Sequence, residues 1–325
     1  MRFVVFGAGA IGGAVGARLD QSGAEVTLIA RGAHAEALRR GLILEAPEES
    51  VTLHIPVVTD VRDLTWTDDT VVLLSVKGQD TDGAMAQLVT VAPPDTAVVC
   101  MQNGVENERR VLRHFPNTYG LCVMCPATHL KPGVIQLHSA PVSGLLDLGR
   151  YPNGLDDVGR DIAAALDATA FQSIARPDIM RWKYRKLLMN LANAVEALCG
   201  PSARGSRVAR EAQREGKEAL AAAGIDVVSS ETDRERRGDY LQLRNTDSGE
   251  WGGGSSWQSL ARGTGSIEAE FLNGEIVLEA ALHGLSAPVN ALLERLALQV
   301  ALEGNGPGSM TIEELSALAG VPSEQ

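Results

Sequence analysis

The first feature of the chain is an apolar run that leads directly into three glycines, Gly7, Gly9 and Gly12. A helical pattern follows over residues 10–21, and a second apolar run follows over 26–30. Strand, glycine turn, helix and strand together make a βαβ unit, in which the two strands pair in parallel. The start of the chain therefore predicts a sheet with parallel strands and a ligand site at the turn.

Each of the three glycines has its own physical task in such a turn. Gly7 permits the tight turn off the strand, Gly9 lets the backbone approach a pyrophosphate, and Gly12 lets the helix pack closely on the strand. The first amides of the helix then point at phosphate. An ordinary glycine-rich turn is the alternative. We predict a dinucleotide-binding turn made of Gly7, Ala8, Gly9, Ala10, Ile11 and Gly12.

The end of the second strand distinguishes two dinucleotides. An NAD site places Asp or Glu there, where the carboxylate accepts from the ribose 2′-hydroxyl. This chain has no acid at the strand end and continues with Arg31. A guanidinium suits a 2′-phosphate, because its planar fork of donors matches phosphate oxygens. We predict NADPH as the cofactor; a solvated surface arginine is the alternative.

Composition limits the partners and the compartment. The chain has 325 residues, which is long enough for two domains, and a formal net charge of −12. That charge argues against nucleic acid or an anionic membrane as a partner. No signal peptide or spanning segment is apparent, so a cytoplasmic protein is expected. Cys122 and Cys125 have redox-motif spacing but lie in a strand-like run, so we expect reduced core thiols, and no metal cluster is evident.

The pattern of elements changes near residue 175. Before it, strands alternate with helices, which predicts a parallel sheet covered on both faces. From Pro177 onward helical spacing dominates, including one long helix over Asp178–Leu198. The expected fold class is α/β, with a Rossmann-type nucleotide-binding domain over residues 1–175 and an all-helical domain over 176–325. The helical domain is expected to bind substrate and to form a homodimer, with the active site between the domains.

Two motifs follow later strands of the first domain, at the sheet edge where open α/β sheets bind ligands. Lys77 and Gln79 come directly after an apolar run over 71–76. They would face cofactor phosphate or substrate carboxylate, or else be solvated loop residues. Asn103 follows the next run, over 96–100. Its amide suits the nicotinamide carboxamide or the substrate, although Asn-Gly alone is also typical of a turn.

The helical domain carries a polar stripe on an otherwise apolar helix. Lys186 and Asn190 are four residues apart and share a helix face, with Asn193 and Lys183 within a further turn. Asn is a poor residue for a helix interior, so two of them need a reason, although a solvated face is the alternative. Glu268, on another predicted helix, would either be an exposed charge or orient a substrate hydroxyl and tune a lysine.

In combination these residues resemble the ketopantoate reductase (2-dehydropantoate 2-reductase) family over essentially the whole chain. The resemblance rests on the Gly7–Gly12 turn, Arg31, Lys77-x-Gln79, Gln102-Asn103-Gly104, Ala127–Gly133, Lys186-Leu-Leu-x-Asn190 and Glu268–Gly274. It implies NADPH-dependent reduction of a small-molecule 2-oxo acid, most simply 2-dehydropantoate to (R)-pantoate in pantothenate biosynthesis. It further implies that Lys186 is the general acid, that Glu268 holds the substrate hydroxyl, and that Asn103 and Asn190 position substrate and cofactor amide.

The chain departs from the family pattern at two places in the helical domain. The family has a second asparagine four residues after Asn190; here that position is Ala194, and Asn193 lies one step earlier, about 100° round the helix. The family also has an asparagine shortly before its substrate-carboxylate serine. Here that segment is Gly252-Gly253-Gly254, and Ser255 or Ser256 supplies the serine.

These departures keep two other functions open. The first is the same chemistry on a different 2-oxo acid, since the altered residues would contact the substrate carboxylate and tail. The second is a catalytically silent NADP(H)-binding sensor. A sensor needs neither Lys186 nor Glu268, so the presence of both disfavours it.

Overall fold

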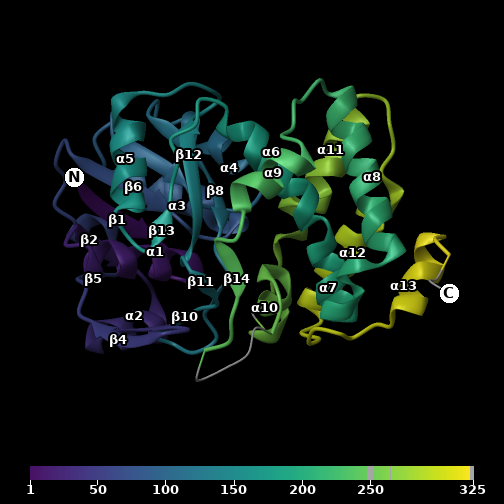
Figure 1. Ribbon diagram of the computed structural model, residues 1–325, viewed down its shortest axis with the longest axis horizontal. Helices are drawn as coiled ribbons and strands as arrows, with labels where there is room; N and C mark the ends of the chain where they lie inside the picture. The colour runs from purple at the N-terminus through teal and green to yellow at the C-terminus, as the bar shows by residue number, and fades with distance from the viewer. Residues whose placement is uncertain (247–251, 264, 323–325) are drawn as a thin grey trace. The chain divides into compact units, whose positions relative to one another are not determined.

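The computed structural model describes residues 1–246, 252–263 and 265–322 (Figure 1). The chain divides into two compact units: Met1–Lys183 with Glu231–Trp251, and Tyr184–Ser230 with Gly252–Gln325. This division differs from the expected single boundary at residues 175 and 176. Helix α6 (Ile179–Asn190) begins in the first unit and ends in the second, and a later segment returns to the first unit.

The first unit combines strands and helices. Its strands are β1 (Arg2–Phe6), β2 (Glu25–Ile29), β3 (Leu42–Ala46), β4 (Glu49–Leu53), β5 (Val57–Val58), β6 (Thr70–Leu74), β7 (Ala97–Cys100), β8 (Thr118–Met124), β9 (Ala127–Thr128), β10 (Val134–Leu137), β11 (Ser139–Pro141), β12 (Gly144–Arg150), β13 (Phe171–Gln172) and β14 (Leu241–Leu243). Its helices are α1 (Ala10–Gln21), α2 (Gly32–Arg40), η1 (Val61–Asp63), η2 (Gly78–Asp80), α3 (Thr81–Leu88), α4 (Asn107–Leu112), α5 (Asp157–Asp167) and α9 (Ser230–Arg237).

The main sheet has eight strands in the order β13-β12-β8-β7-β6-β1-β2-β5. The adjacent strands β5, β2, β1, β6, β7 and β8 are all parallel, and β12 runs antiparallel to β8. Alternate residues of β1 face different cores: Phe3 and Val5 pack with α1 and α5, whereas Val4 and Phe6 pack with α3 and α4. Because both faces are covered, the strands are apolar throughout. The predicted Rossmann-type α/β unit is confirmed.

A smaller sheet, in the order β4-β3-β10-β9, packs against α1. Its close approach explains a fourth glycine near the turn, because a Cβ added at Gly13 would lie 2.8 Å from the Ile135 side chain. Helix α1 is therefore enclosed by apolar neighbours on more than one side, and small residues fill its surface. The alternation of strand and helix did not predict this second sheet, whose strand β4 is only half buried.

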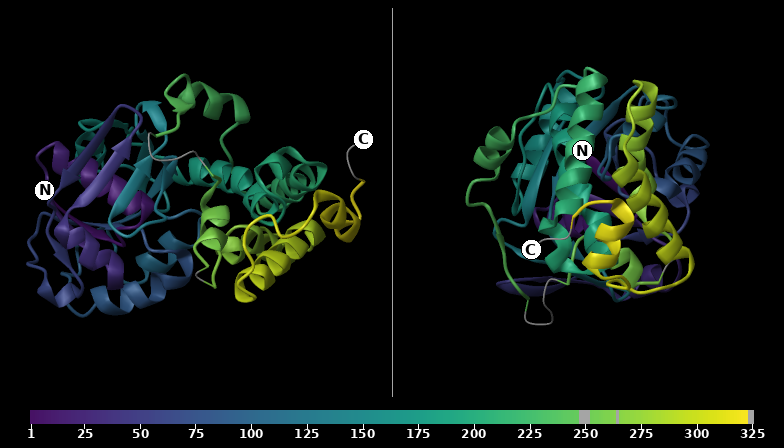
Figure 2. Two further views of the ribbon diagram at one scale, coloured as in Figure 1. Left: turned by 90° about the horizontal axis from the view of Figure 1, so that it is seen from below. Right: turned by 90° about the vertical axis from the view of Figure 1, so that its right-hand side faces the viewer.

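The described residues of the second unit form helices, as predicted. Besides the end of α6 they are α7 (Ala192–Cys199), η3 (Pro201–Gly205), α8 (Arg207–Ala222), α10 (Ser255–Ala261), η4 (Glu268–Phe271), α11 (Asn273–Leu282), α12 (Pro288–Leu302) and α13 (Ile312–Ala319). Helix α7 packs against α8, α10 and α12, and α11 packs against α8 and α12 (Figure 2). Helix α13 begins with a capping box between Thr311 and Glu314.

The predicted helix over Asp178–Leu198 is not continuous, because the helical bonding is interrupted at Leu191, between α6 and α7. The Leu191 carbonyl accepts a hydrogen bond from Asn273 Nδ2 at 3.2 Å, and the same amide donates to Asn290 Oδ1 at 2.9 Å. Leu191 is the N-cap residue of α7 and keeps helical dihedral angles, and its carbonyl accepts this additional bond from Asn273 of α11. Helical periodicity continues through the break, so the sequence alone does not reveal it.

The segment that returns to the first unit is held by charge and by strand pairing. Arg236 of α9 donates from Nη2 and Nε to the buried Asp147 carboxylate at 2.7 and 2.9 Å. Arg176 donates to the same carboxylate at 2.6 Å. Strand β14 pairs antiparallel with β11. These contacts join α9 and β14 to the first unit, which is why one boundary cannot divide the chain.

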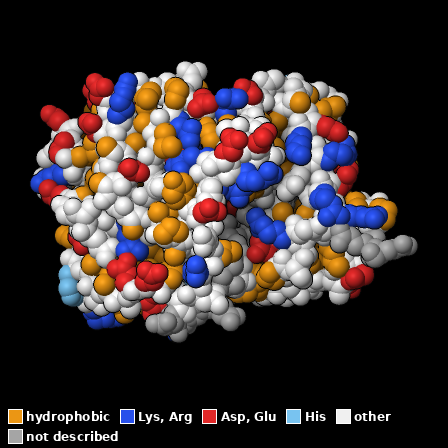
Figure 3. Space-filling view, in the orientation of Figure 1, with side chains coloured by type: hydrophobic (Ala, Val, Ile, Leu, Met, Phe, Trp, Pro, Cys, Tyr) orange, Lys and Arg blue, Asp and Glu red, His pale blue; other side chains and the backbone are white. Residues whose placement is uncertain are grey.

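Among the described residues, no helix is long and apolar enough to cross a membrane. All four cysteines, including Cys122 and Cys125, carry free thiols. Acidic and basic side chains are interspersed on the face drawn in Figure 3.

Candidate functional site

The glycine turn after β1 is held by hydrogen bonds to residues at the ends of both neighbouring strands. Gly7 has φ of +103°, a conformation that favours glycine. The amides of Gly7 and Ala8 both donate to the Ile29 carbonyl at the end of β2, at 3.2 Å. Ser75, directly after β6, donates from Oγ to the Gly7 carbonyl at 2.6 Å. The turn thus has a fixed shape before any ligand binds.

The two other glycines have surroundings that match their predicted tasks. A Cβ at Gly12 would collide with the Gly7 carbonyl oxygen and with Ser75 Oγ, so only glycine lets α1 lie this close to the strand ends. A Cβ at Gly9 would meet nothing within 4 Å. Gly9 is the N-cap of α1, no side chain caps the helix, and no acid lies in its first turn, which Ala10 and Ile11 begin. Uncapped amides beside open space suit an anionic group such as pyrophosphate.

Arg31 occupies the predicted position at the end of β2. It is the N-cap residue of α2, and its side chain is exposed. Within the described part of the chain its guanidinium makes no hydrogen bond or ion pair. The fork of donors is therefore available to a phosphate group next to the turn.

His34, on α2, contacts the glycine turn and was not predicted from the sequence. The Gly133 amide donates to its Nδ1 at 3.0 Å, so the ring proton resides on Nε2 and donates to the Ala8 carbonyl at 2.7 Å. Burial lowers the pKa of His34 below its ordinary value, and the bond to Ala8 partly opposes that shift. The neutral imidazole thus joins the glycine turn to the segment before β10. The only sequence indication was its position three residues after Arg31.

Lys77, Gln79 and Asn103 lie on the loops that follow β6 and β7. Lys77 is half-buried and is the N-cap residue of η2, which contains the exposed Gln79. Asn103 is half-buried between β7 and α4. Since β1, β6 and β7 are adjacent and parallel, these loops leave the sheet at the same edge as the glycine turn. The structure therefore brings the predicted cofactor-binding residues of the first unit to one edge.

Lys183, which the sequence placed in a polar stripe, lies instead in the core of the first unit. Its side chain is 2% exposed and forms an ion pair with Glu108, which is 0% exposed. Its Nζ also donates to the Gln102 carbonyl at 3.1 Å. Burial raises the pKa of the Glu108 carboxyl, and the charge of Lys183 opposes that shift. Lys183 is therefore not part of an accessible polar stripe with Lys186, and Glu108 is a second residue that the sequence did not indicate.

Lys186 and Asn190 lie on α6 in the second unit. Lys186 is half-buried, and Asn190 is 7% exposed. The Nδ2 of Asn190 is buried and has no hydrogen-bond partner in the protein. A buried amide without a partner costs free energy, so a ligand group that accepts from it is the expected explanation.

Glu268 is the other predicted catalytic residue of the second unit. It is the first residue of η4 and is 5% exposed. Burial lowers the pKa of the nearby Arg262, and the Glu268 carboxylate opposes that shift. Glu268 is therefore not the solvated charge that was the alternative interpretation.

Asn193 and Ala194 differ in environment. Ala194 is buried in the core, whereas the Oδ1 of Asn193 accepts from Arg204 Nη1 at 2.8 Å. The same Arg204 nitrogen donates to the buried Glu196 carboxylate at 2.6 Å. The sequence did not indicate Arg204 or Glu196, because nothing in their spacing connects them to the family pattern. Arg204 contacts Asn193 directly, and Glu196 is connected to Asn193 through Arg204.

The glycine-rich segment before α10, Gly252–Gly254, is hydrogen-bonded to Glu196 of the Arg204–Glu196 ion pair. The Gly254 amide donates to Glu196 Oε1 at 3.0 Å, and a Cβ at Gly254 would lie 2.9 Å from Glu196 Oε2. Ser255, the first residue of α10, is half-buried, whereas Ser256 is buried. Accessibility therefore favours Ser255 of the two predicted serines.

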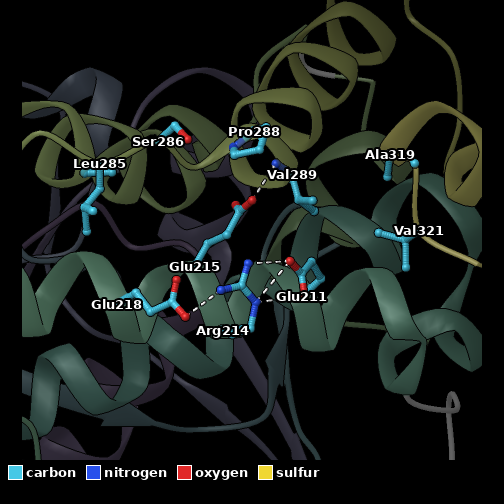
Figure 4. Close-up of a pocket in the computed structure, with 12 residues that line it drawn as sticks. Glu211, Arg214, Glu215, Glu218, Leu285, Ser286, Pro288, Val289, Ala319 and Val321 are labelled. Atoms are coloured by element: carbon cyan, nitrogen blue, oxygen red, sulfur yellow. Dashed lines mark hydrogen bonds and ion pairs between the residues drawn. The ribbon is translucent and has the colours of Figure 1, made fainter.

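A separate pocket of about 410 Å³ lies in the second unit. Figure 4 shows Glu211, Arg214 and Glu218 of α8 joined by ion pairs on its wall, with Glu215 bonded to the Val289 amide. None of the predicted site residues lines this pocket. Among the described residues, no group of three or more His, Cys, Asp or Glu could hold a metal ion.

Comparison with known proteins gives the same family for both parts of the chain. The family model described as ketopantoate reductase PanE/ApbA matches residues 3–153, and the model of its C-terminal part matches residues 178–301. The 2-dehydropantoate 2-reductase of Pyrococcus horikoshii is 28% identical over 318 residues, which are 95% of this chain and 100% of that protein. The enzyme of the same name from Archaeoglobus fulgidus is 27% identical over 91% of this chain and 96% of its own.

Solved structures resemble the chain over nearly its whole length. A PanE/ApbA family ketopantoate reductase from Ralstonia eutropha JMP134 has a TM-score of 0.78 and 25% identity, covering 94% of this chain and 99% of that one. The ternary structure of D-mandelate dehydrogenase with NADH and anilino(oxo)acetate has a TM-score of 0.79 and 22% identity, covering 94% and 100%. The second likeness is one of fold alone.

Proposed function

Because the chain belongs to the ketopantoate reductase PanE/ApbA family, we propose that it reduces 2-dehydropantoate to (R)-pantoate with NADPH, a step of pantothenate biosynthesis. Family and relatives identify an oxidoreductase that acts on a CH–OH group and belongs to the 2-dehydropantoate 2-reductase type. The observation that carries the proposal is the buried, unpartnered Nδ2 of Asn190, one helical turn from Lys186. An amide and an ammonium on one helix face suit the oxygens of a 2-oxo acid.

The residues of the first unit fit a nicotinamide dinucleotide with a 2′-phosphate. The glycine turn offers uncapped amides to the pyrophosphate, and Arg31 offers donors to the 2′-phosphate. Lys77, Gln79 and Asn103 follow strands at the same sheet edge. When bound, the reduced nicotinamide supplies the hydride of the reaction.

The protein side of the reaction is proton delivery and orientation. Lys186 would donate its proton to the carbonyl oxygen of the 2-oxo acid, which otherwise would become an alkoxide. Glu268 would accept from the substrate hydroxyl, and Asn190 would donate to a substrate oxygen. Asn103 would hold the substrate or the cofactor amide, while Asn193 and Ser255 or Ser256 would contact the substrate carboxylate.

Residues of the second unit also favour a second candidate function, the reduction of a different 2-oxo acid. Ala194 replaces an asparagine of the family, and Arg204 engages Asn193 instead. The Gly252–Gly254 segment is bonded to Glu196 at the place where the family has another asparagine. These changes alter the contacts to the acid while Lys186 and Glu268 remain. The NADP(H)-binding sensor has no such observation in its favour.

A screen of NADPH oxidation by the purified protein tests the proposal, with 2-dehydropantoate as the reference and other branched or aromatic 2-oxo acids beside it. The proposal expects the largest kcat/KM for 2-dehydropantoate. A clear preference for another acid would move the assignment to the second substrate. Tight NADPH binding without oxidation by any acid would identify the sensor. The homodimer and the cytoplasmic location stay predictions.

A further inference from the structure

The ion pair between Lys183 and Glu108 is almost completely buried, and protein stability alone does not explain why two charges lie in the core. The two side chains are 2% and 0% exposed. An apolar pair of similar volume is often at least as stable as a buried ion pair, because desolvation of two charges offsets their attraction. The presence of both charges in the core of the first unit therefore needs another explanation.

The fold makes room for this pair. Gly120 lies on β8 beside it, and a Cβ added there would be 3.2 Å from Glu108 Oε1 and 3.3 Å from Lys183 Cδ. A side chain at residue 120 would therefore press on both charged partners. Glycine in the interior of a strand weakens it, and often marks a place where another group approaches closely.

The pair holds the loop that carries Asn103. Besides Glu108, Lys183 Nζ contacts the Gln102 carbonyl, to which it donates at 3.1 Å. The Gln102 side chain donates to Thr81 Oγ1 at 3.1 Å, and Thr81 Oγ1 donates to Asn107 Oδ1 at 2.7 Å.

The same chain of bonds continues to Asn103 itself. Asn107 Nδ2 donates to the Asn103 carbonyl at 3.3 Å. Two consecutive carbonyls of the loop, those of Gln102 and Asn103, are thus fixed from two directions. Gly104 follows with φ of +78°, which turns the chain sharply after Asn103.

We propose that Lys183 is a positioning residue, and that its ion pair with Glu108 holds the Gln102–Gly104 turn so that the Asn103 side chain is presented to the reaction. Glu108 fixes the direction of the ammonium, and the ammonium fixes the Gln102 carbonyl. The role of Asn103 rests on the proposed function. The geometry of the turn does not, so the two can be tested separately.

The test is the double variant Lys183→Met/Glu108→Leu, because a single substitution leaves one buried charge without its partner and threatens folding. The control is Arg2→Met/Glu25→Leu, which removes an ion pair of β1 and β2 at the opposite ends of their strands from the glycine turn. For each protein three quantities are measured: the thermal midpoint, the deuterium uptake of amides 101–107, and kcat and KM for the 2-oxo acid that the wild type reduces.

The proposal expects a double variant that unfolds at the wild-type temperature or above it, with faster exchange in residues 101–107 and kcat/KM lowered by about 100-fold, the loss typical of a misplaced catalytic group. The control should match the wild type in exchange and in kinetics. A folded double variant with unchanged exchange and unchanged kcat/KM would overturn the proposal. If the wild type reduces no 2-oxo acid, the proposed function fails, and the exchange measurement still decides whether Lys183 holds the turn.

Discussion

The two candidate sites are built from different parts of the chain. The site in the first unit is mostly backbone: a turn at Gly7, uncapped amides at the start of α1, and open space at Gly9. The site in the second unit is made of side chains, with Lys186 and Asn190 on α6 and Glu268 on η4. The shape of a backbone site depends on the glycines that permit it, whereas a side-chain site changes with each substitution of its residues. The departures from the family pattern accordingly lie in the second unit.

The largest effect that separates the two sites is expected from Lys186→Ala. If Lys186 protonates the carbonyl oxygen, the variant should lower kcat by about 10²- to 10⁴-fold, the usual contribution of a general acid. The dissociation constant for NADPH, measured by fluorescence titration, should stay near that of the wild type.

Lys217→Ala is the control for this variant, because Lys217 is an exposed lysine of the same unit. Lys183→Ala is unsuitable, since it would leave Glu108 buried without its partner. If KM for the 2-oxo acid rises while kcat is unchanged, Lys186 contributes uniform binding and not proton transfer.

The next largest effect is expected from a substitution in the first unit, which should change cofactor binding and leave the catalytic step unchanged. Arg31→Ala removes charge-assisted hydrogen bonds to the 2′-phosphate, worth about 1.5–3 kcal/mol, so KM for NADPH should rise by roughly 10- to 100-fold. KM for NADH should hardly change, because NADH has no 2′-phosphate. Steady-state kinetics with both cofactors measure the ratio, and an equal rise for both would remove Arg31 from the phosphate site.

Gly12→Ala and Gly9→Ala test whether the two glycines have different tasks. The Cβ at Gly12 collides with backbone and with Ser75, so we expect a loss of about 1–3 kcal/mol in the free energy of unfolding, as in other overpacked sites. The Cβ at Gly9 meets no protein atom, so stability should be kept while NADPH binding weakens. Urea unfolding and cofactor titration measure the two effects. Equal stability loss in both variants would contradict the distinction.

The smallest expected effect is on the pH dependence of the free energy of unfolding, and it involves His34. Its pKa is lowered from 6.5 by burial, so the folded protein binds fewer protons than the unfolded chain below that pH. The stabilisation is therefore present above pH 6.5 and is lost as the pH falls towards the lowered pKa. The free energy of unfolding of the wild type should decrease more between pH 7.5 and 5.5 than that of His34→Gln. Parallel slopes in the two proteins would show that His34 does not contribute.

Local patterns explain what the sequence could predict, and long-range contacts explain what it could not. The glycine turn and the apolar strands depend on neighbours within a few residues, so spacing reveals them. The bond from Asn273 to the Leu191 carbonyl, at the interruption between α6 and α7, joins residues 82 positions apart in the chain. Lys183 is 75 residues from Glu108, and nothing in a helical stripe distinguishes a buried lysine from an exposed one.

The same limit applies to the substrate end of the site. Glu196 and Arg204 lie on neighbouring elements, α7 and η3, and their pairing is local. Their connection to Gly254 is not, since Glu196 and Gly254 are 58 residues apart. The family pattern reveals that two asparagines are absent from this chain, but only the folded chain shows which groups occupy their surroundings.

The return of Glu231–Trp251 to the first unit has a consequence for how the protein can be divided. The chain passes between the units after Lys183, after Ser230 and again after Trp251, so neither unit is one uninterrupted stretch of polypeptide. An amino-terminal fragment ending at residue 183 would contain Asp147 but not Arg236, and β11 but not β14. Exchange of the helical unit between relatives would therefore require two inserted pieces with matched joints, and a single crossover cannot transfer it intact.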